Sequence, residues 1–360
     1  MKKIILLDSS YPINSRNTRL LKTLAKVYRV KYITWNRDNS KIQEDGFESG
    51  IFTKKAEYGN KFKKLINIFE YYKFISKVIK KESPNIIIAS HWEMLFIAKL
   101  LKSKYKFKIV YENLDMPDSK YPIIQKIIKY IEKKGIKNTE GTIFASRFFT
   151  EFYHLDKTLV FENYVAEESQ KKFKKTNNNI HTQKKIAFIG NIRHYEILKN
   201  LIKAAFNKNV KLDFYGSGLA EEKLKEFCFN ESINTVTFHG KYNYSELREI
   251  YSEIQVVWAA YPNKSFNVKY AISNKFFEVL HYKKIGIFSS GTKLSELVSR
   301  NKIGLVVDPY SVTSIEECIE KVTNENISSE IKKNINDFSL KENIQWSENE
   351  NRLLDFFKEI

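Results

Sequence analysis

The sequence predicts an α/β protein with two doubly wound parallel sheets, on three observations. Apolar runs of about four or five residues alternate with longer segments whose apolar residues recur at helical spacing. This alternation occurs in two series, and a polar stretch without periodicity, residues 166–184, separates them. The chain has 360 residues, which corresponds to about two domains at roughly 150 residues each.

The first series contains the following elements. Its expected strands are residues 4–7, 31–35, 85–89, 108–111 and 141–145, and its expected helices are residues 20–28, 62–79, 94–101 and 123–136. The strands are continuously apolar rather than alternating, which is typical of a parallel sheet that helices cover on both faces.

The second series begins after the polar stretch. Its expected strands are residues 185–189, 211–215, 236–238, 255–259, 286–289 and 304–307, and its expected helices are residues 196–205, 221–229, 244–250, 275–280, 294–299 and an amphipathic tail helix at 346–360. We therefore expect an N-terminal domain at 1–165, a linker at 166–184, a C-terminal domain at 185–345, and a last helix at 346–360 that returns to the first domain.

Composition restricts the class of protein. Lys and Arg total 61 and Asp and Glu total 42, a net charge of +19, which favours an anionic partner, substrate or docking surface. The two cysteines, Cys228 and Cys318, exclude a disulfide scaffold and argue against a cysteine metal site. The N-terminal apolar run covers only residues 4–7, too short for a signal peptide, and no stretch is long enough to span a membrane. We expect a cytoplasmic protein.

Residues that follow the expected strands are the first candidates for a site. Gly190 follows the strand at 185–189, and Arg193 and Lys199 come soon after it. A glycine turn that leads into a helix can hold an anion by backbone N–H groups, and the two cations can clamp a diphosphate. A tight turn with two surface cations is an equal alternative. At 214–218, the glycines Gly216 and Gly218 are more simply read as a turn between strand and helix.

Two further segments carry candidate side chains. Gly240 and Lys241 end the strand at 236–238 and can contact a base, whereas His239 alone is more often structural. Glu278 lies in an otherwise apolar helix start, where a carboxylate is costly unless it is paired. It can accept hydrogen bonds from the two hydroxyls of a ribose, or it can simply favour the helix start. Six histidines without metal-ligand spacing argue against a metal site.

The string Asn274-Lys275-Phe276-Phe277-Glu278, with Lys284-Ile285-Gly286 after it, resembles a segment of the family 4 (group 1) glycosyltransferases of the GT-B fold. The segments around Gly190, Gly216 and Gly240 follow in that family's order. The N-terminal half resembles it at residues 90–93, 111–115, 145–147 and 162–163. One departure is clear, since Tyr270 stands where the family carries the first of two glutamates.

The resemblance implies an enzyme that moves a sugar from a nucleotide-sugar to an acceptor hydroxyl, with retention, without metal or cofactor, in a cleft between two facing domains. It implies roles for named residues. The catalytic candidates are Arg193, Lys199 and His91; the donor-binding candidates are Gly190, Gly216, Gly240, Lys241, Asn274, Lys275 and Glu278; and the acceptor-side candidates are Glu112 and Asp115. A metal-free site needs fixed positive charge or helix dipoles at the leaving diphosphate.

The basic excess suggests a further partner. Lysines flank the expected helix at 62–79, and the segment 123–134 combines isoleucines with lysines, a pattern of helices that lie on anionic membranes. We therefore expect peripheral docking at the inner face of the plasma membrane, so that a lipid-linked saccharide acceptor can reach the cleft. A solvated basic helix is nearly as good an interpretation. The family resemblance implies a role in bacterial capsule or surface polysaccharide synthesis.

Other functions remain open from the sequence. A nucleotide-sugar epimerase, a phosphorylase or a non-catalytic partner subunit can share the fold. A nucleic-acid-binding protein would agree with the net positive charge, but the sequence has no nucleic-acid-recognition motif to support that function.

Overall fold

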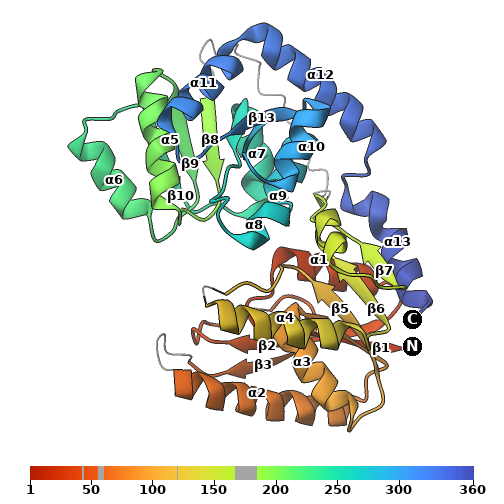
Figure 1. Cartoon of the computed structure of the whole chain (residues 1–360). Helices are drawn as coiled ribbons and strands as arrows, with labels where there is room; N and C mark the ends of the chain where they lie inside the picture. Colours follow the sequence, from red (N-terminus) through yellow and green to blue (C-terminus); the bar gives the residue numbers. More distant parts are fainter. Residues whose placement is uncertain (43, 56–60, 120, 167–184) are drawn as a thin grey trace. The chain divides into compact units, whose positions relative to one another are not determined.

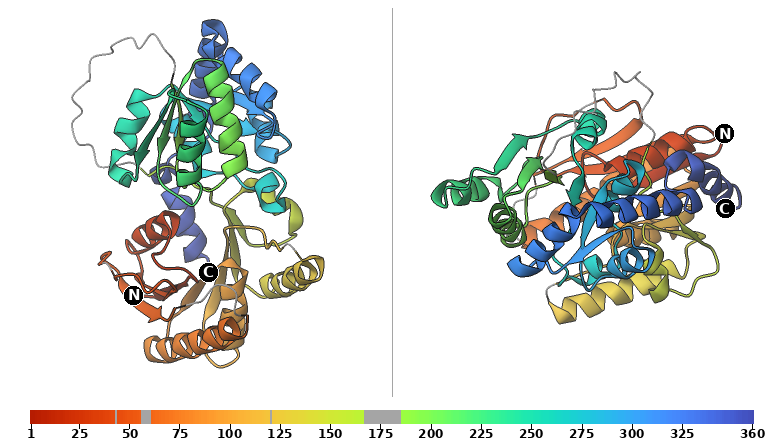
Figure 2. Two further views of the ribbon diagram at one scale, coloured as in Figure 1. Left: turned by 90° about the vertical axis from the view of Figure 1, so that its left-hand side faces the viewer. Right: turned by 90° about the horizontal axis from the view of Figure 1, so that it is seen from above.

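The structure is a computed structural model that describes residues 1–42, 44–55, 61–119, 121–166 and 185–360. It divides into two compact units: unit 1 contains Met1–Glu162 and Asn349–Ile360, and unit 2 contains Asn163–Glu348. Each unit is a parallel sheet with helices on both faces (Figures 1 and 2), so the predicted α/β class with two Rossmann-like sheets is confirmed. The expected cleft stays a prediction, and the expected linker lies, from residue 167 on, outside the described residues.

Unit 1 is built on parallel strands that pair in the order β3-β2-β1-β4-β5-β6-β7 over its described residues. These are β1 (Lys3–Leu7), β2 (Arg29–Asn36), β3 (Glu48–Thr53), β4 (Ile86–Ser90), β5 (Lys108–Asn113), β6 (Gly141–Phe144) and β7 (Thr158–Val160). The helices are α1 (Ser15–Leu24), α2 (Lys61–Glu82), α3 (His91–Lys102), α4 (Pro122–Ile136), the 3₁₀ helix η1 (Arg147–Phe152) and α13 (Trp346–Lys358), of which residues 349 onward belong to unit 1.

The core of unit 1 follows from side-chain alternation along its strands. In β1, Ile5 and Leu7 join a core cluster that includes Tyr71 and Ile75 from α2. Because successive strand side chains point to opposite faces, Ile4 and Leu6 are buried on the other face. This burial of both faces is why the strands are continuously apolar.

The first helix begins and ends earlier than the expected 20–28. The side chain of Asn14 accepts a hydrogen bond from the backbone N–H of Asn17 at 2.8 Å, which is how an N-cap residue starts a helix. The helix therefore begins at Ser15 and ends at Leu24. Its first turn has too few apolar residues for hydrophobic periodicity to indicate where the helix starts.

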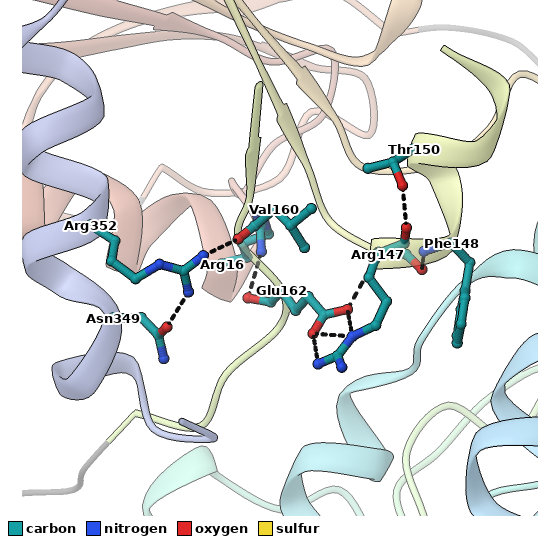
Figure 3. Close-up of polar contacts among 9 residues, drawn as sticks. Arg16, Arg147, Phe148, Thr150, Val160, Glu162, Asn349 and Arg352 are labelled. Atoms are coloured by element: carbon teal, nitrogen blue, oxygen red, sulfur yellow. Dashed lines mark hydrogen bonds and ion pairs between the residues drawn. The ribbon is translucent and has the colours of Figure 1, made fainter. Parts of the chain in front are cut away.

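Two ion pairs with fully buried carboxylates fix the strand ends of unit 1. Arg16 is 4% exposed and its Nε lies 3.0 Å from Oε1 of Glu112, which is 0% exposed. Arg16 also donates to the backbone oxygens of Phe161 and Glu162 at 2.6 and 2.9 Å. The Glu162 carboxylate in turn accepts from the guanidinium of Arg147, with its shortest contact at 2.7 Å (Figure 3). The loop after β7 is thus tied to α1 and to η1.

Unit 2 repeats the architecture, with parallel strands in the order β10-β9-β8-β11-β12-β13 over its described residues. These are β8 (Lys185–Ile189), β9 (Lys211–Tyr215), β10 (Val236–Gly240), β11 (Val256–Trp258), β12 (Ile285–Ser289) and β13 (Gly304–Val307). The helices are α5 (Tyr195–Asn207), α6 (Glu221–Asn230), the 3₁₀ helix η2 (Tyr244–Glu246), α7 (Leu247–Glu253), α8 (Phe266–Tyr270), α9 (Asn274–His281), α10 (Lys293–Asn301), α11 (Val312–Thr323) and α12 (Glu325–Lys341).

The Arg16–Glu112 pair yields a stability prediction. Replacing Arg16 with Met leaves a buried carboxylate without its cation, and we expect unit 1 to lose about 3–5 kcal/mol, measured by urea denaturation. The control is Arg29→Met, which breaks an exposed ion pair to Glu48 and should change stability much less. Adding Glu112→Gln to Arg16→Met should recover part of the loss. Equal effects of the two single variants would contradict this account.

Candidate functional site

The strand order of unit 2 reverses between β8 and β11. From β8 the chain continues to β9 and β10 on one side, whereas β11, β12 and β13 lie on the other. In open parallel sheets, ligands bind beyond the carboxyl ends of the strands at such a reversal. The residues that follow β8, β11 and β12 are therefore the place to look for a site.

A cavity of about 440 Å³ lies at this reversal, a size typical of small-molecule sites, which span about 300–1,000 Å³. Arg193 and His194 line it from the loop after β8, Tyr261 from the loop after β11, and Ser289 from the end of β12. Ser273, the residue before α9, also lines it, as do the polar side chains of Ser265 and Thr292. The cavity lies wholly within unit 2.

The glycine turns beside the cavity are joined by backbone hydrogen bonds. The N–H of Gly190 donates to the oxygen of Tyr215 at 2.8 Å, and that of Gly216 donates to the oxygen of Gly240 at 2.7 Å. A Cβ on Gly216 would lie 1.9 Å from the oxygen of Gly190, and Gly216 has a φ of +130°. Gly216 is thus required for close packing of two turns, which agrees with the simpler interpretation of the 214–218 segment.

Positive charge in the cavity rests on Arg193. Its side chain is exposed, and its Nε donates to Nε2 of His194 at 3.2 Å. Burial lowers the pKa of His194 below its usual value, and the neighbouring Arg193 lowers it further. His194 is therefore neutral at neutral pH, and the guanidinium of Arg193 is the fixed cation of this lining.

Lys199 lies elsewhere. Its ammonium sits 5.1 Å from the ring centroid of Phe227 in α6 and 5.7 Å from that of Tyr195, and it is not among the cavity-lining residues. The diphosphate clamp of Arg193 and Lys199 therefore stays a prediction.

Glu278 is buried in α9 and is paired. Its Oε2 lies 2.5 Å from Nζ of Lys275 and accepts a hydrogen bond from the hydroxyl of Tyr251 at 2.7 Å. Burial and the Glu278 carboxylate together raise the pKa values of Tyr251 and Tyr261. Both of these contacts use Oε2, and Glu278, like Lys199, is not among the residues that line the cavity. The same pairing also supports the plain structural interpretation of Glu278.

The start of α9 holds an unsatisfied polar group. The Oγ of Ser273 is buried and has no hydrogen-bond partner among the described residues. It lines the cavity at the helix N-terminus, next to the exposed Asn274. Buried polar atoms normally have a partner, so an orphan here points to a ligand atom, and a helix N-terminus favours an anionic one.

In the candidate segment at the end of β10, His239 packs within the protein and Lys241 is exposed. His239 stacks on Tyr215, with ring centroids 4.2 Å apart, and its Nε2 lies 3.3 Å from Oδ1 of Asp213. Lys241 is exposed after Gly240, whose φ is +76°. The structure therefore leaves Lys241 available, and it gives His239 a packing role.

In unit 1, the sequence candidates have different surroundings. His91 is half-buried at the start of α3 with a φ of +70°, a strained conformation for a non-glycine residue that is enriched at functional sites. Asp115 is exposed. Glu112 is fully buried against Arg16 and accepts a hydrogen bond from Ser90 at 2.6 Å, so its carboxylate is engaged within the protein.

Sequence reasoning missed His194, Tyr261, Ser273 and Ser289 as cavity residues. His194 and Ser273 each precede a helix, Ser289 ends a strand, and Tyr261 lies in the loop after β11, all at the reversal of strand order. The available signal was therefore position rather than residue type. Within the described ranges, no group of three or more His, Cys, Asp and Glu side chains is placed to hold a metal ion, and no helix there is long and apolar enough to cross a membrane.

Comparison with known proteins identifies the domain that contains the cavity. Residues 169–339 match the family described as glycosyl transferases group 1. The chain is a glycosyltransferase, as the sequence predicted. No curated protein matches the sequence.

Solved structures of the same fold cover the whole glycosyltransferase chain. Sucrose-phosphate synthase from Thermosynechococcus elongatus superposes with a TM-score of 0.77 at 12% identity, covering 100% of this chain and 99% of the other. Anabaena HepE in complex with UDP-glucose gives 0.73 at 13%, covering 100% of both. A glycosyltransferase from Rickettsia africae gives 0.70 at 15%, covering 99% and 98%. The predicted GT-B fold is confirmed.

Proposed function

We propose that this glycosyltransferase moves a sugar from a nucleotide-sugar to a lipid-linked saccharide during assembly of a capsule or surface polysaccharide. The observation that carries the donor assignment is the cavity at the strand reversal of the group 1 domain, with one fixed cation and one orphaned hydroxyl in its lining. The likeness of fold to Anabaena HepE in complex with UDP-glucose supports a nucleotide-sugar donor.

The donor's diphosphate fits between Arg193 and the start of α9. Arg193 supplies a permanent charge, the Oγ of Ser273 supplies a hydrogen-bond donor, and the N-terminus of α9 supplies partial positive charge. The ribose hydroxyls are proposed to donate to Oε1 of Glu278, and the base to lie against Gly240 and Lys241. Asn274, exposed beside Ser273, and Lys275, which holds Glu278, complete the donor side.

The chemical step breaks the bond between the anomeric carbon and the diphosphate oxygen, and it forms a bond from that carbon to the acceptor oxygen. Negative charge develops on the leaving diphosphate, and Arg193 is placed to stabilise it. In the retaining course that we propose, the departing phosphate oxygen takes the acceptor proton. No enzymic nucleophile is then required, and catalysis rests on position and charge. His91 is proposed to contact the transferred sugar, and Asp115 the acceptor.

A screen of nucleotide-sugars tests the donor assignment. The protein is mixed separately with UDP-glucose, UDP-N-acetylglucosamine, GDP-mannose and their nucleoside diphosphates, and melting temperature and slow diphosphate release are measured. A true donor should raise the melting temperature, since binding to the folded state at about 100 times its Kd stabilises by about 2.7 kcal/mol. A chain that neither binds nor hydrolyses any nucleotide-sugar would defeat the proposal.

Arg193→Ala should lower kcat for transfer or donor hydrolysis by about 10²–10³-fold, the usual effect of removing one group that stabilises developing negative charge. Lys203→Ala is the matched control, because Lys203 is a cation of α5 that lies 5.7 Å from the ring of Phe227, outside the cavity lining. Lys199→Ala should behave like the control. A loss for Lys199→Ala as large as that for Arg193→Ala would restore Lys199 to the diphosphate clamp.

Glu278→Gln should weaken binding of the donor's nucleoside diphosphate by about tenfold or more, since a hydrogen bond to a charged group contributes about 1.5–3 kcal/mol. Isothermal calorimetry measures the affinity, and thermal melting checks that the variant is folded. The control is Tyr251→Phe, which removes the other hydrogen bond to Oε2 and leaves Oε1 in place. Unchanged nucleotide affinity in a folded Glu278→Gln protein would assign this glutamate a structural role alone.

A further inference from the structure

Helix α4 has an inverted pattern of burial. Of its fifteen residues, only Glu132, Gly135 and Ile136 are buried. Ile123 is 74% exposed and Tyr130 is 65% exposed, whereas the helix's only acid, Glu132, is 2% exposed. An ordinary surface helix places its apolar residues inward and its charged residues outward. Here, most of the large apolar side chains face away from the core.

The inversion is fixed by specific contacts. The Glu132 carboxylate accepts hydrogen bonds from the hydroxyls of Tyr111 and Tyr153 at 2.5 and 2.7 Å and from Nδ2 of Asn113 at 3.0 Å. Gly135 packs so closely on α3 that a Cβ there would lie 2.9 Å from a methyl carbon of Leu95. Turning the helix would break these hydrogen bonds and bury lysines, so the apolar face stays outward.

The exposed surface is apolar and basic at once. We define the α4 face as the exposed side chains Ile123, Ile124, Lys126, Ile127, Lys129, Tyr130, Lys133 and Lys134. Helix α3 packs beside α4 (Figure 1) and adds the exposed Phe96 and Leu100. Burial and the nearby Lys102 and Lys134 lower the pKa of Lys99, which shows how closely the positive charges are spaced.

Helix α2, the other basic helix, differs. Its apolar residues Tyr71, Ile75 and Ile79 are buried in the core of unit 1, whereas Ile68 and Phe69 are exposed. Over the described residues, α4 exposes more large apolar side chains beside its lysines than α2 does.

We propose that the α4 face docks on an anionic lipid surface. Lysines interspersed with isoleucines and a tyrosine suit the boundary between headgroups and acyl chains, where apolar side chains insert and cations remain at phosphate level. With its acid buried, α4 presents no negative charge to repel such a surface. This inference deepens the proposed function and rests on it. Docking would bring the enzyme to its acceptor, because a lipid-linked acceptor is found only at a membrane.

Co-sedimentation with lipid vesicles tests the docking. The full chain is mixed at low salt with vesicles of phosphatidylcholine that contain about one third phosphatidylglycerol, and in parallel with pure phosphatidylcholine. We expect binding to the anionic vesicles that weakens as salt rises. Lys126→Gln/Lys129→Gln/Lys133→Gln should reduce the partition coefficient about a hundredfold, since each lysine near an anionic surface contributes about fivefold. Ile123→Ser/Ile127→Ser/Tyr130→Ser should also abolish binding.

The matched control is Lys73→Gln/Lys77→Gln/Lys80→Gln, which removes the same charge from exposed positions of α2 and should retain most of the binding. The absence of binding to anionic vesicles, or equal losses for the two lysine triples, would overturn the proposal. So would a dimer, detected by light scattering, that the serine triple dissociates. Donor hydrolysis in solution is measured on the same proteins. Vesicle binding without hydrolysis would refute the proposed function alone, and hydrolysis without vesicle binding would refute only the docking.

Discussion

The cost of burying a carboxylate organises much of this structure. Glu112 is paired with Arg16, Glu162 with Arg147, and Glu278 with Lys275. Glu132 instead has three neutral donors, and burial raises its pKa. A buried charge without such partners costs several kcal/mol, so each pair fixes how its two elements meet. The first pair joins α1 to β5, the second joins the loop after β7 to η1, the third stabilises the first turns of α9, and the contacts of Glu132 set the rotation of α4.

The pairs also separate structural acids from available ones. In unit 1, both oxygens of Glu112 are engaged, by Arg16 and by Ser90, so a carboxylate at a strand end is part of the framework there. In unit 2, the two contacts of Glu278 fall on one oxygen. A carboxylate held by two contacts is oriented before a ligand arrives, which supports the proposal that the ribose binds at Glu278.

Much of the fold could be predicted from the sequence, because continuous apolar strands such as 4–7, 86–90 and 285–289 can be buried only in a sheet covered on both faces. Strand β3 was missed because Glu48, Ser49 and Gly50 give its first half no apolar signal, and its residues lie at the sheet edge, mostly half-exposed. Strand β7 has only three residues. Short or edge strands depend on the neighbour that pairs with them, and that neighbour is not local in sequence.

In the candidate site, too, features set by local sequence could be predicted and features set by distant residues could not. The glycines that follow β8 and β9, and the glycine that ends β10, could be recognised, since turns at strand ends require them. The surroundings of side chains could not: Arg16 reaches Glu112 across 96 residues, and the position of Lys199 depends on Phe227 from the next helix. Segment 123–134 showed isoleucines beside lysines, but the sequence alone could not tell which set faces the sheet.

The close approach of Gly216 to Gly190 restricts how this scaffold can diversify. Any side chain at Gly216 would collide with a backbone oxygen, and Gly218 is similarly enclosed by Ile192. Random libraries that mutate these turns will be dominated by misfolded clones. Val268, on the half-exposed segment around α8, also lines the cavity and already carries a side chain there, whereas the Ser265 side chain caps α8 by accepting from the N–H of Val268. An engineer who wants a different donor sugar should randomise that segment and leave the glycine turns unchanged.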